Sequence, residues 1–78
     1  MKVKKLLKYC VFDCQLTIYS ANKFTIYDGH ISELKNKQLL NMKVLRYYIR
    51  HFDIYNVMII DTVEAVDFNF IRSLGCEK

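Results

Sequence analysis

The sequence predicts one small α+β domain: a mostly antiparallel four-stranded sheet with two or three short helices packed on one face, in the order α-β-β-α-β-β-α. The chain has 78 residues, so residues 1–78 form one domain. Runs that alternate apolar and polar residues, as strands do, stand between runs whose apolar residues recur three and four apart, as in helices. Apolar residues make up 53% of the chain, with six Tyr and five Phe, a composition that argues against disorder.

The first half of the chain is typical of a helix, a hairpin and a second helix. Residues 3–10 carry four apolar side chains three and four apart, which predicts a short amphipathic helix. Residues 15–19 and 24–27 alternate around a polar turn, which predicts a β-hairpin that ends at the dipeptide 28–29. Ser32 is the expected N-cap of the second helix.

The second half is predicted to form two strands and a helix. Residues 43–51 alternate, and residues 54–62 are rich in β-branched side chains, which indicates a strand that is buried on both faces. Asp67 is a suitable cap for a helix over 68–74, with Gly75 at its end.

The charge of the chain is uneven. Residues 1–51 contain ten Lys and Arg against three acids, a balance of +7, whereas residues 52–78 contain two against five, a balance of −3. Such asymmetry is found on surfaces that bind polyanions, and it is also compatible with a folded domain that mixes these charges over its surface.

No targeting or membrane segment is expected. Lys8 interrupts the apolar run at the start of the chain, and the aliphatic run 57–60 is far shorter than the roughly 20 residues that cross a bilayer. Cys10, Cys14 and Cys76 are an odd number of cysteines, which favours reduced thiols. We therefore expect a cytoplasmic protein with no membrane partner.

The residues that could carry chemistry do not form a recognisable set. Cys10 and Cys14 are one loosely spaced pair, and His30, His51 and Cys76 are scattered, so neither a zinc site nor a cysteine nucleophile with a base is indicated. The chain has no glycine-rich phosphate loop and no acid pair spaced for proton transfer. We expect no catalytic residue, no metal, no cofactor and no enzyme activity.

A candidate binding face follows from strand periodicity. If one face of the sheet packs on the helices, the other is turned outward. The residues expected to face the helices are Leu16, Ile18, Phe24, Ile26, Leu45, Tyr47 and Ile49, and those expected to face outward are Thr17, Tyr19, Thr25, Tyr27, Arg46, Tyr48 and Arg50.

Tyrosine and arginine are common in the central contacts of protein interfaces, and aromatic rings beside arginines also stack on nucleic-acid bases. The predicted partner-binding residues are Tyr19, Tyr27, Arg46, Tyr48 and Arg50. Lys4, Lys5 and Lys8 are a secondary basic patch. Both sets are also compatible with an ordinary solvated surface, which is the usual role of lysines on a first helical turn.

Four segments carry a family resemblance, namely residues 1–9 (MKVKKLLKY), 16–19 (LTIY), 27–31 (YDGHI) and 40–44 (LNMKV). Over residues 1–61 the chain is similar to short accessory proteins encoded by phages and prophages of Gram-positive bacteria, and it departs from them after residue 61. The resemblance implies a stoichiometric, non-catalytic role in the cytoplasm of a bacterial host, against a host protein or nucleoprotein complex. The roles that this resemblance implies include inhibition of a CRISPR-type defence complex.

The sequence leaves two functions open. The first is such a host-directed binding protein, and because the chain is basic it would not act by mimicking nucleic acid. The alternative is a small nucleic-acid-binding protein that uses the Tyr/Arg face together with the lysines. A homodimer is also expected, because a small sheet with open edges invites pairing.

Overall fold

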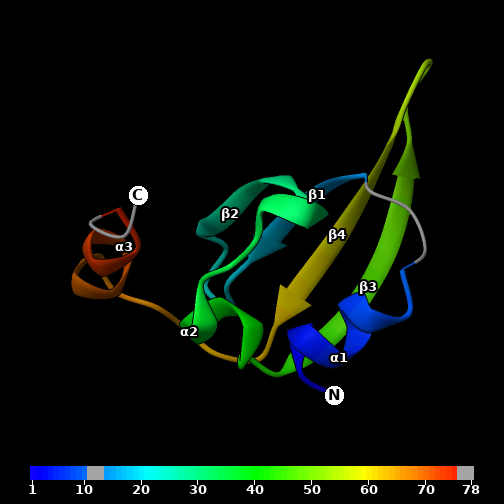
Figure 1. The fold of residues 1–78 in the computed structure, drawn as a ribbon. Helices are drawn as coiled ribbons and strands as arrows, with labels where there is room; N and C mark the ends of the chain where they lie inside the picture. Colours follow the sequence, from blue (N-terminus) through cyan, green and yellow to red (C-terminus); the bar gives the residue numbers. More distant parts are fainter. Residues whose placement is uncertain (11–13, 76–78) are drawn as a thin grey trace.

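The computed structural model describes residues 1–10 and 14–75 (Figure 1). Their elements, in chain order, are α1 (Val3–Lys8), β1 (Gln15–Tyr19), β2 (Thr25–His30), the 3-10 turn η1 (Ile31–Glu33), α2 (Lys37–Leu40), β3 (Val44–His51), β4 (Asn56–Thr62) and α3 (Phe68–Gly75).

The four strands form one mixed sheet in the order β2-β1-β4-β3. The two outer pairings, β1 with β2 and β3 with β4, are antiparallel, and the central pairing of β1 with β4 is parallel. The predicted fold class, a small α+β domain with a mostly antiparallel four-stranded sheet, is therefore confirmed. The parallel pair arises because β4, the last strand in the chain, inserts between β1 and β3.

The hydrophobic core lies between one face of this sheet and the short helices. Leu16 and Ile18 of β1, Ile60 of β4 and Val3 of α1 are completely buried there, and Leu39 of α2 is nearly so. As predicted, β4 is buried on both faces, since every residue from Val57 to Thr62 is buried. β4 lies between β1 and β3, so side chains of these two strands also cover the residues that β4 turns away from the helices.

A β-bulge corrects one predicted site residue. The register of β1 and β2 shifts between Ile18 and Tyr19, so that Tyr27 pairs with Ile18. Cross-strand partners share a face, so Tyr27 is turned to the helix side. It packs against the core, and its hydroxyl donates to the carbonyl of His30 at 2.7 Å. The expected outward position of Tyr27 was wrong, because simple alternation ignores the extra residue of a bulge.

The helices also leave part of the sheet uncovered. Leu45, Tyr47 and Ile49 were expected to be packed beneath them, but these side chains are 63%, 51% and 51% exposed. The reason is length: α1 has six residues and α2 has four, and both pack over the centre of the sheet. Phe24 precedes β2, is 38% exposed, and contacts Phe68 of α3 with ring centroids 6.1 Å apart.

Two helix caps were predicted, one of them at the wrong residue. Asn36, not Ser32, caps α2, because its side chain accepts from the N–H groups of Gln38 and Leu39. Ser32 lies in η1. Asp67 caps α3 as expected, with its carboxylate 2.9 Å from the N–H of Phe70.

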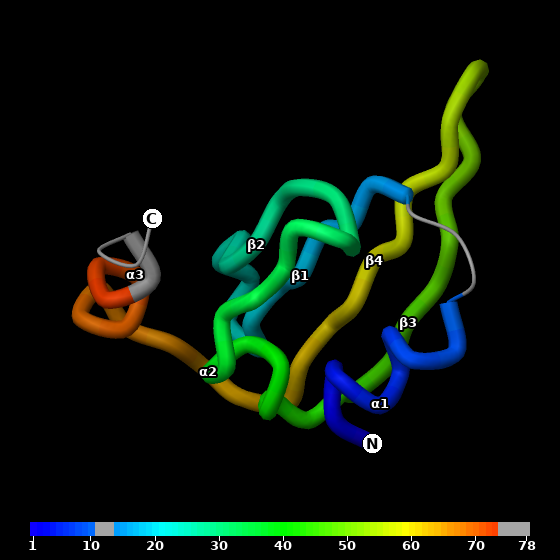
Figure 2. The backbone as a smooth tube through the Cα atoms, in the orientation of Figure 1, coloured from blue at the N-terminus to red at the C-terminus, as the bar shows by residue number. Residues whose placement is uncertain are grey.

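The segment that leads to α3 is attached to the β1–β2 turn. The amide of Asn22 donates to the carbonyl of Val66 at 2.8 Å and accepts from its N–H at 3.2 Å. The N–H of Ala21 also donates to the carbonyl of Glu64. Figure 2 shows the chain leaving β4 and running beside this turn to α3. None of the described helices is long and apolar enough to cross a bilayer.

Candidate functional site

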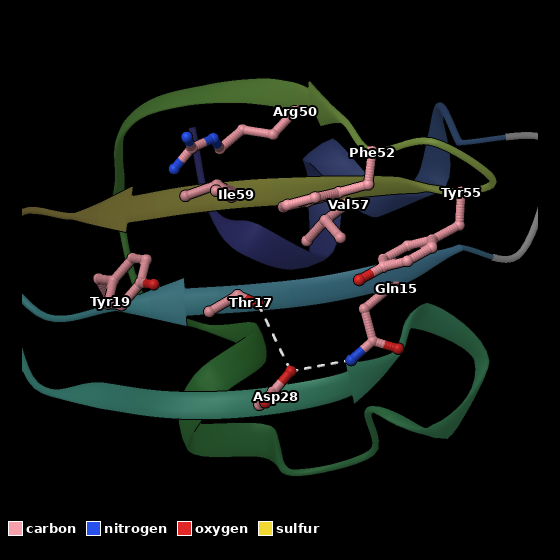
Figure 3. A pocket seen from close by; sticks show the side chains of 9 residues that line it. All are labelled: Gln15, Thr17, Tyr19, Asp28, Arg50, Phe52, Tyr55, Val57 and Ile59. Carbon is pink, nitrogen blue, oxygen red and sulfur yellow. Dashed lines mark hydrogen bonds between the residues drawn. The ribbon is translucent and has the colours of Figure 1, made fainter.

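A shallow groove of about 480 Å³ crosses the outer face of the sheet, opposite the helices (Figure 3). We call it the outer-face groove, and it is lined by Gln15, Thr17, Tyr19, Asp28, Arg50, Phe52, Tyr55, Val57 and Ile59. All four strands and the β3–β4 turn contribute to it. Its position follows from period-two geometry, which turns alternate residues of each strand away from the core.

The floor of the groove is apolar. Val57 and Ile59 of β4 are only 8% and 5% exposed, although they do not belong to the core on the helix side. They are covered instead by side chains from the neighbouring strands. Because the floor itself is nearly covered, a partner would gain the free energy of burying apolar surface mainly from the exposed rings of Phe52 and Tyr55 beside it.

One wall of the groove is polar and held in place by hydrogen bonds. A carboxylate oxygen of Asp28 in β2 accepts from the side-chain amide of Gln15 at 2.8 Å and from the hydroxyl of Thr17 at 3.5 Å. Gln15 and Thr17 are two residues apart in β1, so their side chains lie on the same face of the sheet. Both therefore reach the Asp28 carboxylate on the neighbouring strand β2. This wall offers an oriented acceptor to a bound group.

The opposite end is aromatic. Phe52 and Tyr55 stack at the β3–β4 turn with centroids 5.1 Å apart and planes 17° apart, and the N–H of Phe52 donates to the carbonyl of Tyr55. The ring of Tyr55 points into the groove between Val57 and Gln15 (Figure 3). Ile54, at the tip of the same turn, is 91% exposed.

Two arginines on this face differ in their electrostatic surroundings. Arg46 donates from Nε to Asp61 at 2.7 Å, and this hydrogen bond, with the carboxylate charge, raises the pKa of Arg46. Its charge is therefore balanced by Asp61. Arg50 lines the groove and forms no hydrogen bond or ion pair with any other described side chain. Arg50 thus carries the uncompensated positive charge of the groove.

The structure brings together four of the five predicted site residues. Tyr19 and Arg50 line the groove, and Arg46 and Tyr48 lie on the same face, opposite Asp61 and Ile59. Tyr27 lies on the other face.

Besides the floor residues Val57 and Ile59, sequence reasoning missed four lining residues, because their positions depend on how strands and turns come together. Gln15 and Asp28 are 13 residues apart and meet only through strand pairing, and Phe52 and Tyr55 lie around an expected turn. The two aromatic residues on either side of the dipeptide Asp53-Ile54 were the available signal for the second pair.

The lysine patch is a separate surface. Lys4, Lys5 and Lys8 are exposed on α1, whose buried residues Val3 and Leu6 pack on the helix side of the sheet. In Figure 3, α1 lies behind the sheet while the groove faces the viewer. Because Lys4, Lys5 and Lys8 lie on the side of the molecule opposite the outer-face groove, one flat ligand cannot contact both surfaces.

The cysteine and histidine residues do not form a reactive centre within residues 1–10 and 14–75. The thiol of Cys10 points to the carbonyl of Leu6 and to the sulfur of Met58, and burial, with a smaller contribution from Cys14, raises its pKa. His51 is hydrogen-bonded to Asn56. No three His, Cys, Asp or Glu side chains of this part gather as metal ligands. Cys76 lies outside the described residues.

Comparison with known proteins found no match: no protein-family model, curated protein sequence or solved structure matches the chain.

Proposed function

We propose that this protein acts as a stoichiometric, non-catalytic binding protein that docks a partner protein on its outer-face groove. The observation that carries the proposal is the composition of the groove: an apolar floor, exposed aromatic rings at one end, and an arginine without an ion-pair partner in the described part of the chain. Aromatic residues and arginine supply much of the binding energy where they surround such a floor.

The charge of this face favours a protein over a nucleic acid. Arg46 is balanced by Asp61, Asp28 places a negative charge in the groove, and the lysines lie on the opposite side of the molecule. Phosphate binding needs several uncompensated cations along one surface. The rings of Tyr19, Phe52 and Tyr55 could stack on bases, so binding of single-stranded nucleic acid is the second candidate function.

The nature of the partner is suggested by the sequence resemblance to phage and prophage accessory proteins. On that basis the partner is a host protein or nucleoprotein complex in the bacterial cytoplasm, and inhibition of a CRISPR-type complex is one specific form of this role. A net charge of +4 supports binding to an acidic surface of such a partner and disfavours mimicry of nucleic acid.

The test is affinity capture from a lysate of a Gram-positive bacterium, with and without nuclease. Arg50→Ala and Tyr19→Ala remove groove side chains, while Arg72→Ala removes an exposed arginine on α3 and serves as the matched control. We expect the wild type and Arg72→Ala to capture the same protein in both lysates, and the groove variants to capture at least tenfold less.

Two results would contradict the proposal. Equal capture by all variants would exclude the groove as the binding site. Capture that disappears with nuclease, together with binding of plain single-stranded RNA or DNA that falls steeply with salt, would favour the nucleic-acid function instead.

A further inference from the structure

β3 is an edge strand with an open edge. It pairs only with β4 in the sheet order. Because the N–H of Phe52 donates to the carbonyl of Tyr55, the alternation of the antiparallel ladder directs the backbone of Arg50 and Tyr48 toward β4. The N–H and C=O groups of Tyr47, Ile49 and His51 are therefore directed away from β4, toward the open edge.

The start of this edge is closed, and among residues 1–10 and 14–75 nothing closes the rest of it. Val3 donates to the carbonyl of Met42 at 2.9 Å, and Val44 donates to the carbonyl of Met1 at 2.7 Å, so the N-terminal residues pair with the chain just before and at the start of β3. Beyond Val44, no backbone group from residues 1–10 or 14–75 bonds to the outward groups of β3.

The side chains along the open edge give it little protection. Edge strands usually avoid pairing with another chain through proline, charged side chains (above all lysine) or a bulge in mid-strand. The charged side chains of β3 are Arg46 and Arg50, which lie on the outer face. β3 has no proline or lysine, and its bulge lies at its first residues, between Val44 and Arg46. On its helix side, Tyr47 and Ile49 are each 51% exposed, and none of the described helices covers them.

We infer that β3 pairs with β3 of a second copy of this chain, antiparallel about a two-fold axis at Ile49, to form a continuous eight-stranded sheet. In this register Ile49 opposes Ile49 of the other copy, and each Tyr47 opposes His51. The three outward residues are symmetric about Ile49, so all of their N–H and C=O groups find partners, in six hydrogen bonds.

The side-chain pairs of this register are favourable, which is the argument for a second copy over an unrelated strand. On the outer face Tyr48 opposes Arg50 and Arg46 opposes Phe52, so each cation meets an aromatic ring and no like charges face each other. On the helix side the two exposed isoleucines cover one another. The inference does not depend on the proposed function. Because the two-fold axis is perpendicular to the sheet, the outer-face grooves of both copies lie on the same face of the eight-stranded sheet, and both stay open.

The test is the molar mass in solution, measured by light scattering or sedimentation on the full chain over a range of concentrations. Ile49→Lys places two lysines opposite each other at the axis, whereas Ile54→Lys changes a residue that is 91% exposed and outside the paired segment. We expect the wild type and Ile54→Lys to reach twice the chain mass of 9.3 kDa at high concentration, and Ile49→Lys to stay at the mass of one chain.

A crosslink tests the register directly and does not rely on Ile49→Lys folding. Opposed residues of an antiparallel pair have Cα atoms about 5.5 Å apart, within the range of a disulfide. Oxidised Ile49→Cys should therefore give a covalent dimer, and Ile54→Cys should give no more than the wild type. A wild type that stays at one chain mass at millimolar concentration, or equal crosslinking of both variants, would overturn the inference.

Discussion

Ile59 and Ile60 are adjacent residues of one strand, yet they serve different parts of the molecule. Ile60 is completely buried in the core between Ile18 and Tyr47, and Ile59 forms the floor of the outer-face groove between Thr17 and Tyr48. The run of β-branched residues around them predicted burial on both faces. It contained no information on which face would carry a groove, because that depends on the side chains that neighbouring strands contribute.

At the residue scale, stability should respond to Ile60 and not to Ile54. Ile60→Val removes one buried methyl group and should lower the free energy of unfolding by about 0.5–1.5 kcal/mol, measured by urea denaturation. Ile54→Val makes the same chemical change at a 91% exposed side chain and should change it by less than about 0.5 kcal/mol. Equal losses would contradict the burial of Ile60.

At the scale of elements, strands and helices were more predictable than their faces. The predicted strands 15–19 and 43–51 match β1 and β3 closely, and the predicted helix 68–74 matches α3, because periodicity and caps are local signals. Tyr27 was misplaced because the bulge at Ile18 and Tyr19 changes the alternation by one residue, and no local pattern marks it.

The attachment of α3 gives a second prediction. Asn22→Asp keeps the oxygen that accepts from the N–H of Val66 but loses the N–H that donates to its carbonyl. Losing one such bond costs about 1 kcal/mol, so opening of α3 should be roughly fivefold more frequent. The rate of amide hydrogen exchange should rise in α3 and stay unchanged in β1 and β4.

The control for this experiment is Asn69→Asp, the same substitution at an exposed residue within α3. It should leave the exchange rates close to those of the wild type. If Asn69→Asp accelerates exchange as much as Asn22→Asp does, the bond between Asn22 and Val66 does not hold the segment.

At the scale of the whole molecule, the arrangement of the strands was the least predictable feature. The apolar pattern indicated a sheet and helices on one side, but the parallel pairing of β1 with β4 joins segments about 40 residues apart. The exposure of Tyr47 and Ile49 depends on how far the short helices reach, and their alternation alone predicted burial. Both features follow from long-range packing.

The position of β4 predicts which truncations fold. A chain that ends at His51 lacks the strand to which both β1 and β3 pair, so it should show no cooperative unfolding transition in urea followed by circular dichroism. A chain that ends at Asp67 keeps all four strands and loses α3, and it should unfold cooperatively at a lower urea concentration. Cooperative unfolding of the shorter chain would show that β4 is dispensable.

The central place of β4 also has a consequence for biosynthesis. The 37 residues from Tyr19 to Asn56 take roughly 2–7 s to synthesise at about 5–20 residues per second, and throughout that time β1 has no β4 to cover it. β3 ends only five residues before β4 begins, so it waits for its partner for about 1 s or less. The nascent chain thus exposes the apolar side of β1 for seconds, so a ribosome-associated chaperone has a defined interval in which to protect it from aggregation.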